Sequence, residues 1–157
     1  MIDKMNETDE EYLKRFPSSL RNYLDNEDSL RTFKSEVKKE YQDVIVYRAI
    51  GDPVEVKSSD FLGNVEKRQL DGQKCSRRIV NDFHYHSVTV NESCSELIKA
   101  THFPNSHIKG IAKGKMQCAY GPADFEPHRG HHNWYLFNGM NEVVCRLFKP
   151  INTNTIV

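Results

Sequence analysis

The strongest constraint on the fold is a change of pattern near residue 43. Before this point the chain has no glycine, and its apolar residues recur at the three- and four-residue spacings of helices. After it, the β-branched run from Val44 to Ile50 predicts a buried strand, which Gly51 ends. A chain of 157 residues has room for one modest core. We therefore expect a helical arm over residues 1–42 and an α+β core over residues 43–157.

The arm is predicted to contain three short helices. Ser18 or Ser19 is a suitable N-cap for the second, and Ser29 begins the third. Its first thirty residues hold eight acidic and four basic side chains, an excess of four negative charges. Two interpretations stay open, a solvated helical face and a docking surface for a basic protein partner. The apolar residues at helical spacing are Tyr12, Leu13, Phe16, Leu20, Tyr23, Leu24, Leu30, Phe33 and Val37.

The core is predicted to be mostly antiparallel, with five or six strands and one central helix. The Asn138-Gly139 pair between two apolar runs predicts a hairpin. Residues 60–82 and 121–131 are expected to be loops, the first of them polar and basic. A helix is expected to run from Asn91 or Ser93 to about Thr101. The predicted strands cover residues 44–50, 83–90, 107–116, 132–137 and 142–148.

Composition argues against several functional classes. Lys and Arg total 22 and Asp and Glu total 22, so the chain lacks the basic charge typical of nucleic-acid binding. Mean hydropathy is −0.69 and no apolar run approaches twenty residues, so no membrane span is expected. The polar, acidic start does not resemble a secretory signal. The widely spaced cysteines predict reduced thiols in a cytoplasmic protein; they are Cys75, Cys94, Cys118 and Cys145.

Arg48 is the first candidate functional residue, because it interrupts an otherwise apolar strand. A buried guanidinium without a partner is very costly, so this side chain must face solvent, a protein partner or a ligand. Two interpretations stay open, an arginine on the wet face of the sheet and a clamp for an anion such as phosphate. The chain has neither a phosphate loop nor a dinucleotide-binding glycine motif.

Histidines supply two further candidates. On the predicted strand, His84 and His86 share one face and could bind one metal ion, but no third ligand is fixed by the sequence, so a metal is not expected. The segment 124–134 holds three histidines, two acids and the only tryptophan. This density of titratable and aromatic groups between a turn and a strand indicates a functional loop. It lacks the HExxH spacing of metalloproteases.

Five short motifs, taken together, resemble a large family of small, mostly uncharacterised bacterial proteins. That family has a Tyr-Arg strand, then Asp-Phe-Leu, a serine-bearing strand before a helix, a Gly-His motif with a nearby Trp, and a last valine-rich strand. The resemblance covers roughly residues 44–150. The matching segments are Tyr47-Arg48, Asp60-Phe61-Leu62, Ser87-Val88-Thr89-Val90, Gly130-His131-His132-Asn133-Trp134 and Val143-Val144.

The order of these motifs is similar to that of the ADP-ribosyltransferase-like fold, which implies a split sheet with a cleft between its halves. The resemblance implies that Arg48 contacts the phosphate or ribose of NAD, with Tyr47 and Trp134 beside the cofactor. Ser87, or less favourably Thr89, would orient the nicotinamide ribose. The implied chemistry is loss of nicotinamide through an oxocarbenium-like centre, assisted by a carboxylate.

The third motif departs from that pattern, because it carries no carboxylate at the strand start. Glu126 lies nearby in sequence, in a register that does not suit a strand position. Relatives that act on RNA 2′-phosphate use a histidine in this role, which suits His132, with His131 beside it. The predicted catalytic residues are therefore Ser87, Glu126, His131 and His132.

Three functions follow from these expectations. The first is a bacterial NAD-utilising ADP-ribosyltransferase or NAD glycohydrolase in a toxin or defence role, which binds a small anionic molecule such as NAD or a derivative. The second is a non-catalytic module that binds a protein partner through the acidic arm and the His/Trp loop. The third is a metal-dependent hydrolase or nuclease that uses the histidine cluster.

Overall fold

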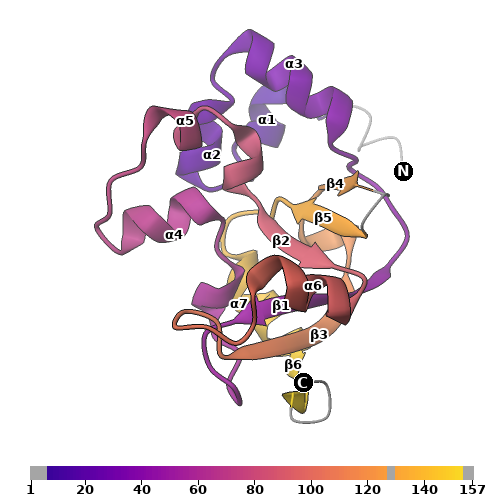
Figure 1. The fold of residues 1–157 in the computed structure, drawn as a ribbon. Coiled ribbons are helices and arrows are strands. Elements are labelled where there is room, and N and C mark those ends of the chain that lie inside the picture. Colours follow the sequence, from indigo (N-terminus) through magenta and orange to yellow (C-terminus); the bar gives the residue numbers. More distant parts are fainter. Residues whose placement is uncertain (1–6, 127–129, 154–157) are drawn as a thin grey trace.

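The computed structural model describes residues 7–126 and 130–153 and has an α+β fold (Figure 1). Its six strands form one antiparallel sheet in the order β4-β5-β2-β1-β3-β6. The helical arm lies beyond the β4–β5 edge of the sheet, and β6 lies at the opposite end. The strands are β1 (Val44–Ile50), β2 (Val88–Asn91), β3 (Gly110–Met116), β4 (Ala123–Glu126), β5 (His131–Trp134) and β6 (Lys149–Pro150).

The three predicted helices of the arm are confirmed as α1 (Asp9–Leu13), α2 (Ser18–Tyr23) and α3 (Glu27–Glu36). The Thr8 side chain accepts a hydrogen bond from the Glu11 amide and Asn26 caps α3, so orphan amide groups at both N-termini are satisfied. The arm residues that repeat at helical spacing, except Leu30, form a hydrophobic cluster with Phe83 and Tyr135 of the core segment. The arm is thus packed onto the sheet region through a shared apolar core.

A second hydrophobic cluster lies on one face of the sheet, covered by α7 (Met140–Leu147) and the short 3-10 helix η2 (Ser58–Phe61). Trp134 and Phe148 pack in it with their ring centroids 6.1 Å apart. The central helix α6 (Cys94–Thr101), capped by Ser93 as predicted, contacts β1 and β2. The remaining elements are α4 (Asn64–Leu70), α5 (Arg77–Val80), η3 (Phe83–His86) and η4 (Cys118–Tyr120).

The sheet is continuous, whereas a split sheet was predicted. Seven residue pairs join β1 to β3, but a single pair, Tyr47 with Asn91, joins β1 to β2. The two strands therefore separate on either side of that pair.

Other expectations about secondary structure are also wrong. The N-cap of α2 is Pro17, so neither Ser18 nor Ser19 caps that helix, and α3 begins at Glu27 and not at Ser29. Residues 60–82 contain α4 and α5, so they are not a continuous loop, and part of the loop expected at 121–131 is strand β4. Residues 83–86 form a 3-10 helix, so His84 and His86 do not alternate along a strand. Residues 142–148 are mostly helix α7: Gly139, in the left-handed conformation at φ 82°, precedes it, and apolar residues four apart face the core.

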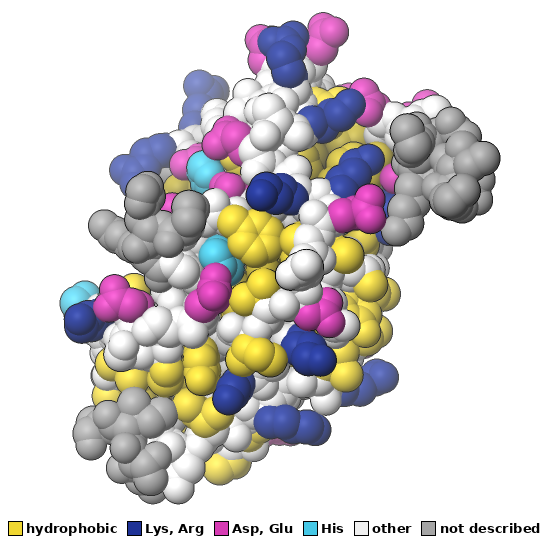
Figure 2. Space-filling model, turned by 90° about the vertical axis from the view of Figure 1, so that its right-hand side faces the viewer, with side chains coloured by type: hydrophobic (Ala, Val, Ile, Leu, Met, Phe, Trp, Pro, Cys, Tyr) yellow, Lys and Arg dark blue, Asp and Glu magenta, His cyan; other side chains and the backbone are white. Residues whose placement is uncertain are grey.

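Among the described residues, no helix has both the length and the apolar character needed to cross a membrane. All four cysteines are free. On the face drawn in Figure 2, basic and acidic side chains are interspersed around hydrophobic side chains that gather near its middle.

Candidate functional site

A cleft of about 860 Å³ opens where β1 and β2 separate. Its walls come from β1, β2 and the adjacent ends of β4 and β5, from α4 and the short helices η2 and η3, and from the segment that runs from α6 to residue 108. This volume lies within the range of small-molecule sites, about 300–1,000 Å³. The lining side chains with most bearing on chemistry are Arg48, Ser87, Thr89, Glu126, His131 and Asn133.

Arg48 bridges the gap between β1 and β2. Its Nε donates to the Asp60 carbonyl oxygen at 2.8 Å. Its Nη1 donates to the carbonyl oxygen of Thr89 at 2.9 Å and to the Thr89 hydroxyl at 3.1 Å. Where β1 and β2 separate, their backbones are not paired with each other. The hydrogen bonds from Arg48 to Thr89 connect the two strands there instead. The guanidinium is thereby held in a fixed orientation at the cleft wall.

The guanidinium keeps its charge at neutral pH. Burial lowers the pKa of Arg48 to about 10, and the negative charge of Asp60 opposes that shift. Within the described part of the chain, Nη2 of Arg48 makes no hydrogen bond, so its N–H groups can donate to a ligand. A planar cation with a free edge suits an anionic ligand such as a phosphate.

Asp60, from the Asp-Phe-Leu motif, has a structural role beside Arg48. This residue is buried, and its carboxylate accepts hydrogen bonds from the amides of Gly51 (3.1 Å) and Lys57 (2.8 Å). Those bonds tie the end of β1 to η2. They also place the Asp60 carbonyl oxygen where it receives the Arg48 Nε.

A second set of polar side chains crosses from β2 to β4. The Ser87 hydroxyl lies 2.7 Å from the His84 carbonyl oxygen and 3.2 Å from Oδ1 of Asn133. The Asn133 Nδ2 donates to Oε2 of Glu126 at 3.1 Å, and His131 Nε2 lies 3.7 Å from the same oxygen. Asn133 is buried, whereas the Glu126 side chain is 52% exposed. The hydrogen bond from Asn133 therefore orients the Glu126 carboxylate, and the exposed part of the carboxylate is accessible to a ligand.

The pairing of β4 with β5 brings Glu126 into the cleft. The two strands are antiparallel with Glu126 opposite His131 and Asp124 opposite Asn133, so all four residues share one face. The expectation that Glu126 lies in an unsuitable register is wrong, because it assumed that the carboxylate must sit on the same strand as the histidines. The cleft also has basic side chains from α4, Lys67 and Arg68.

The sequence motif around β5 divides between the two faces of that strand. His131 lines the cleft, but His132 is 2% exposed on the opposite face, where its Nε2 lies 2.6 Å from Oε2 of Glu92. Trp134 is fully buried, and its indole N–H donates to the Gly121 carbonyl oxygen. Because side chains alternate along a strand, His132 and Trp134 cannot reach a ligand in the cleft.

Three further candidate residues lie away from the polar side chains of the cleft or outside the residues that the structure describes. Tyr47, next to Arg48, does not line the cleft, and its ring packs near Lys113. His86 is buried, stacks on Tyr23 and contacts the Val80 carbonyl oxygen through Nε2. His84 lines the cleft, so the two histidines do not converge on one ion. The third histidine of the loop, His128, lies outside the described residues.

Asn133 and Thr89 are the residues whose importance the sequence understated. Asn133 stands inside the His131–Trp134 segment, but an amide has no titratable group to draw attention to it. The sequence could have identified Asn133 from its position two residues after His131, because residues two apart on a strand share a face. Thr89 shares a face with Ser87 by the same rule, and its contacts with Arg48 depend on the gap beside β1.

The acidic character of the arm is partly neutralised within the arm itself. Asp9 pairs with Lys34 at 2.8 Å and Asp28 with Arg31 at 3.1 Å, and Glu10 lies 3.4 Å from the Lys14 ammonium. These pairs are mostly exposed and individually weak. They reduce the negative charge available to a basic partner.

Comparison with known proteins adds no assignment to this geometry. Neither a protein-family model, nor a curated protein, nor a solved structure matches the chain. The chemical character of the site therefore has to be argued from its own side chains: a fixed guanidinium, a hydroxyl and an open carboxylate around one cleft.

Proposed function

We propose that the chain is an NAD-utilising enzyme that cleaves the bond between nicotinamide and ribose, as ADP-ribosyltransferases and NAD glycohydrolases do. The observation that carries the proposal is the convergence of three side chains on one cleft: Arg48 from β1, Ser87 from the residue between η3 and β2, and Glu126 from β4. The resemblance of the sequence to the ADP-ribosyltransferase-like fold supports it, because that fold implies an arginine or histidine on a first strand and a serine or tyrosine on a later strand before a helix.

Each side chain has a role that its position supports. Arg48 presents a free guanidinium edge, which would bind a phosphate of the dinucleotide. The Ser87 hydroxyl, held by Asn133 and the His84 carbonyl oxygen, would face the nicotinamide ribose. Lys67 and Arg68 would add positive charge for the second phosphate.

Glu126 would act at the reacting carbon. When the glycosidic C–N bond breaks, its electron pair leaves with nicotinamide and positive charge develops on the ribose. A carboxylate beside that charge stabilises it, and then accepts the proton of the attacking water or acceptor hydroxyl. Asn133 holds Oε2 of this carboxylate, while the exposure of the side chain leaves it accessible. His131 lies close enough to influence the same oxygen.

The test measures nicotinamide release from NAD by chromatography. Glu126→Gln should slow release by about 100-fold or more, since it removes the basic oxygen but keeps the size of the side chain. Glu92→Gln is the matched control, because Glu92 contacts His132 on the other face of β5 and should leave release unchanged. Equal rates in the wild type and Glu126→Gln would overturn the assignment of Glu126.

Binding is measured separately, because Arg48 also supports the sheet. NAD at a hundredfold excess over its dissociation constant should stabilise the folded protein by about 2.7 kcal/mol. Arg48→Lys keeps the charge but loses the fork, so it should weaken this stabilisation. If the wild type neither releases nicotinamide nor gains stability with NAD, the proposed function is wrong.

A further inference from the structure

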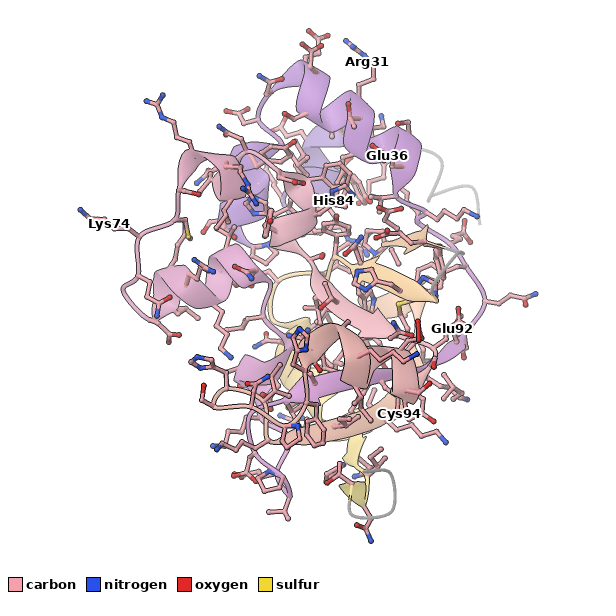
Figure 3. All side chains as sticks on the ribbon, viewed as in Figure 1. Arg31, Glu36, Lys74, His84, Glu92 and Cys94 are labelled. Carbon is pink, nitrogen blue, oxygen red and sulfur yellow. The ribbon has the colours of Figure 1, made fainter. Side chains whose placement is uncertain are left out.

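A second cluster of chemically active side chains lies where the helical arm meets the sheet. Glu36 comes from the end of α3, His84 from η3 and Asp124 from β4, and one ligand atom of each lies within 4.8 Å of the others. Figure 3 shows Glu36 and His84 next to one another at this junction, with Glu92 further away along the sheet. Three segments far apart in sequence therefore place one nitrogen and two carboxylates together.

The imidazole of His84 is already oriented as a metal ligand. Its Nδ1 lies 2.9 Å from Oδ1 of Asp82, and the same oxygen accepts the backbone N–H of His84 as the cap of η3. This contact leaves Nε2 facing Asp124, whose Oδ2 is 3.3 Å away. A carboxylate behind the imidazole is the usual partner of a metal-bound histidine, because it fixes the ring and makes the other nitrogen a better donor.

In the described part of the chain, the only basic side chain paired with the carboxylates of this cluster is His84 itself. Glu36, Asp82 and Asp124 form no ion pair with a described lysine or arginine. Three carboxylates around one imidazole leave negative charge that a divalent cation would neutralise.

The hydroxyl of Tyr135, which has no hydrogen-bond partner among the described residues, is a second observation in favour of a ligand here. Tyr135 is 1% exposed, and its phenolic oxygen has no hydrogen-bond partner among the described residues. Burial raises the pKa of Tyr135, and the negative charges of Asp124, Asp82 and Glu36 raise it further. A buried hydroxyl normally has a partner. A water molecule bound to a metal ion in the cluster would supply one.

We propose that Glu36, His84 and Asp124 bind one divalent transition-metal ion of the zinc class, with Asp82 orienting His84. One imidazole and two carboxylates suit Zn²⁺ better than Ca²⁺ or Mg²⁺, which prefer oxygen ligands throughout. Three protein ligands leave a coordination position for water near Tyr135. The ion joins the end of α3 to β4, at the margin of the cleft that His84 also lines. The site is independent of the proposed NAD chemistry.

The experiment is a calorimetric titration of untagged, chelator-treated protein with Zn²⁺, together with its melting temperature. The wild type should bind one equivalent and melt at a higher temperature with Zn²⁺. Glu36→Gln, which changes an exposed side chain, should bind at least about tenfold more weakly, and Asp82→Asn about tenfold more weakly through the loss of the orienting contact. Asp124→Asn and His84→Asn should also lose binding.

Matched controls distinguish this site from adventitious binding. Glu27→Gln in the same helix and His102→Asn should keep the wild-type affinity. Substitution with Co²⁺ should give a spectrum of nitrogen and oxygen ligands, without the thiolate charge-transfer band that a cysteine site would give. Three results would each overturn the proposal: no stoichiometric Zn²⁺ binding, unchanged affinity in folded Glu36→Gln, or equal affinity for Mg²⁺. NAD cleavage is not part of this readout, so failure here leaves the cleft proposal standing.

Discussion

His131 and Asn133 of β5 line the cleft, whereas His132 and Trp134 of the same strand are buried on its opposite face. On the cleft face, Asn133 connects the Ser87 hydroxyl to the Glu126 carboxylate. On the opposite face, Trp134 belongs to the hydrophobic core. Four consecutive residues thus serve two environments. The comparison teaches that a dense cluster of polar and aromatic residues in sequence need not be one site in space, because a strand separates its neighbours.

The largest effect is expected when the core face of β5 is altered. Trp134→Ala should lower the free energy of unfolding by about 3–5 kcal/mol, because removal of a fully buried indole leaves a cavity and takes away one of the two donors to the Gly121 carbonyl oxygen. His131→Ala on the cleft face should change it by less than about 0.5 kcal/mol. Urea denaturation of both variants measures the difference. Similar losses in the two would mean that the faces are not distinct.

A smaller effect is expected at His132, which tests the same comparison between adjacent histidines. His132→Ala should cost about 1–3 kcal/mol of unfolding free energy, because the ring is buried and contacts both Glu92 and Phe125. Its rate of nicotinamide release should match that of the wild type at a temperature where the variant is folded.

His131→Ala should show the reverse pattern, with nearly unchanged stability and slower release, because its ring lies beside the Glu126 carboxylate. Urea denaturation and the chromatographic assay separate the two quantities. A large loss of rate in fully folded His132→Ala would show that the buried histidine, and not its neighbour, acts on the ligand.

Secondary structure was predictable where the spacing of apolar residues was unambiguous. The arm helices, β1, α6 and β3 follow their patterns closely. Helix α7 was not predicted, because the apolar run Val143, Val144 and Cys145 also fits a strand and the pair Asn138-Gly139 also fits a hairpin turn. A short apolar run does not distinguish a helix from a strand, so packing decides. In the structure, Met140, Val144 and Phe148 meet the core at the four-residue spacing of a helix.

The candidate site was predictable as a set of segments, but not residue by residue. Arg48, Ser87, Glu126 and His131 were identified, and all four line the cleft. Their convergence depends on the loose junction between β1 and β2 and on the register of β4 against β5. A change of one residue in that register would exchange the two faces, and no local pattern in the chain specifies it. The cluster at Glu36 depends likewise on how the arm docks.

The smallest effect is expected at His86, a histidine that belongs to neither face of β5. Its ring stacks on Tyr23 of the arm, and burial lowers the pKa of His86 below its usual value near 6.5. The folded protein therefore holds a neutral ring, and the unfolded chain binds more protons below about pH 6.5. Stability from this group is present above that pH and is lost as the pH falls toward the lowered folded-state pKa.

His86→Phe keeps an aromatic ring beside Tyr23 but removes the titration. The unfolding free energy of the wild type should fall more steeply between about pH 7 and about pH 5 than that of this variant, as measured by urea denaturation at each pH. His107→Phe is the control, because His107 is exposed and should leave the slope unchanged. Parallel pH profiles for the wild type and His86→Phe would mean that the arm does not hold His86 in its neutral form. Acid would then weaken the molecule through other groups.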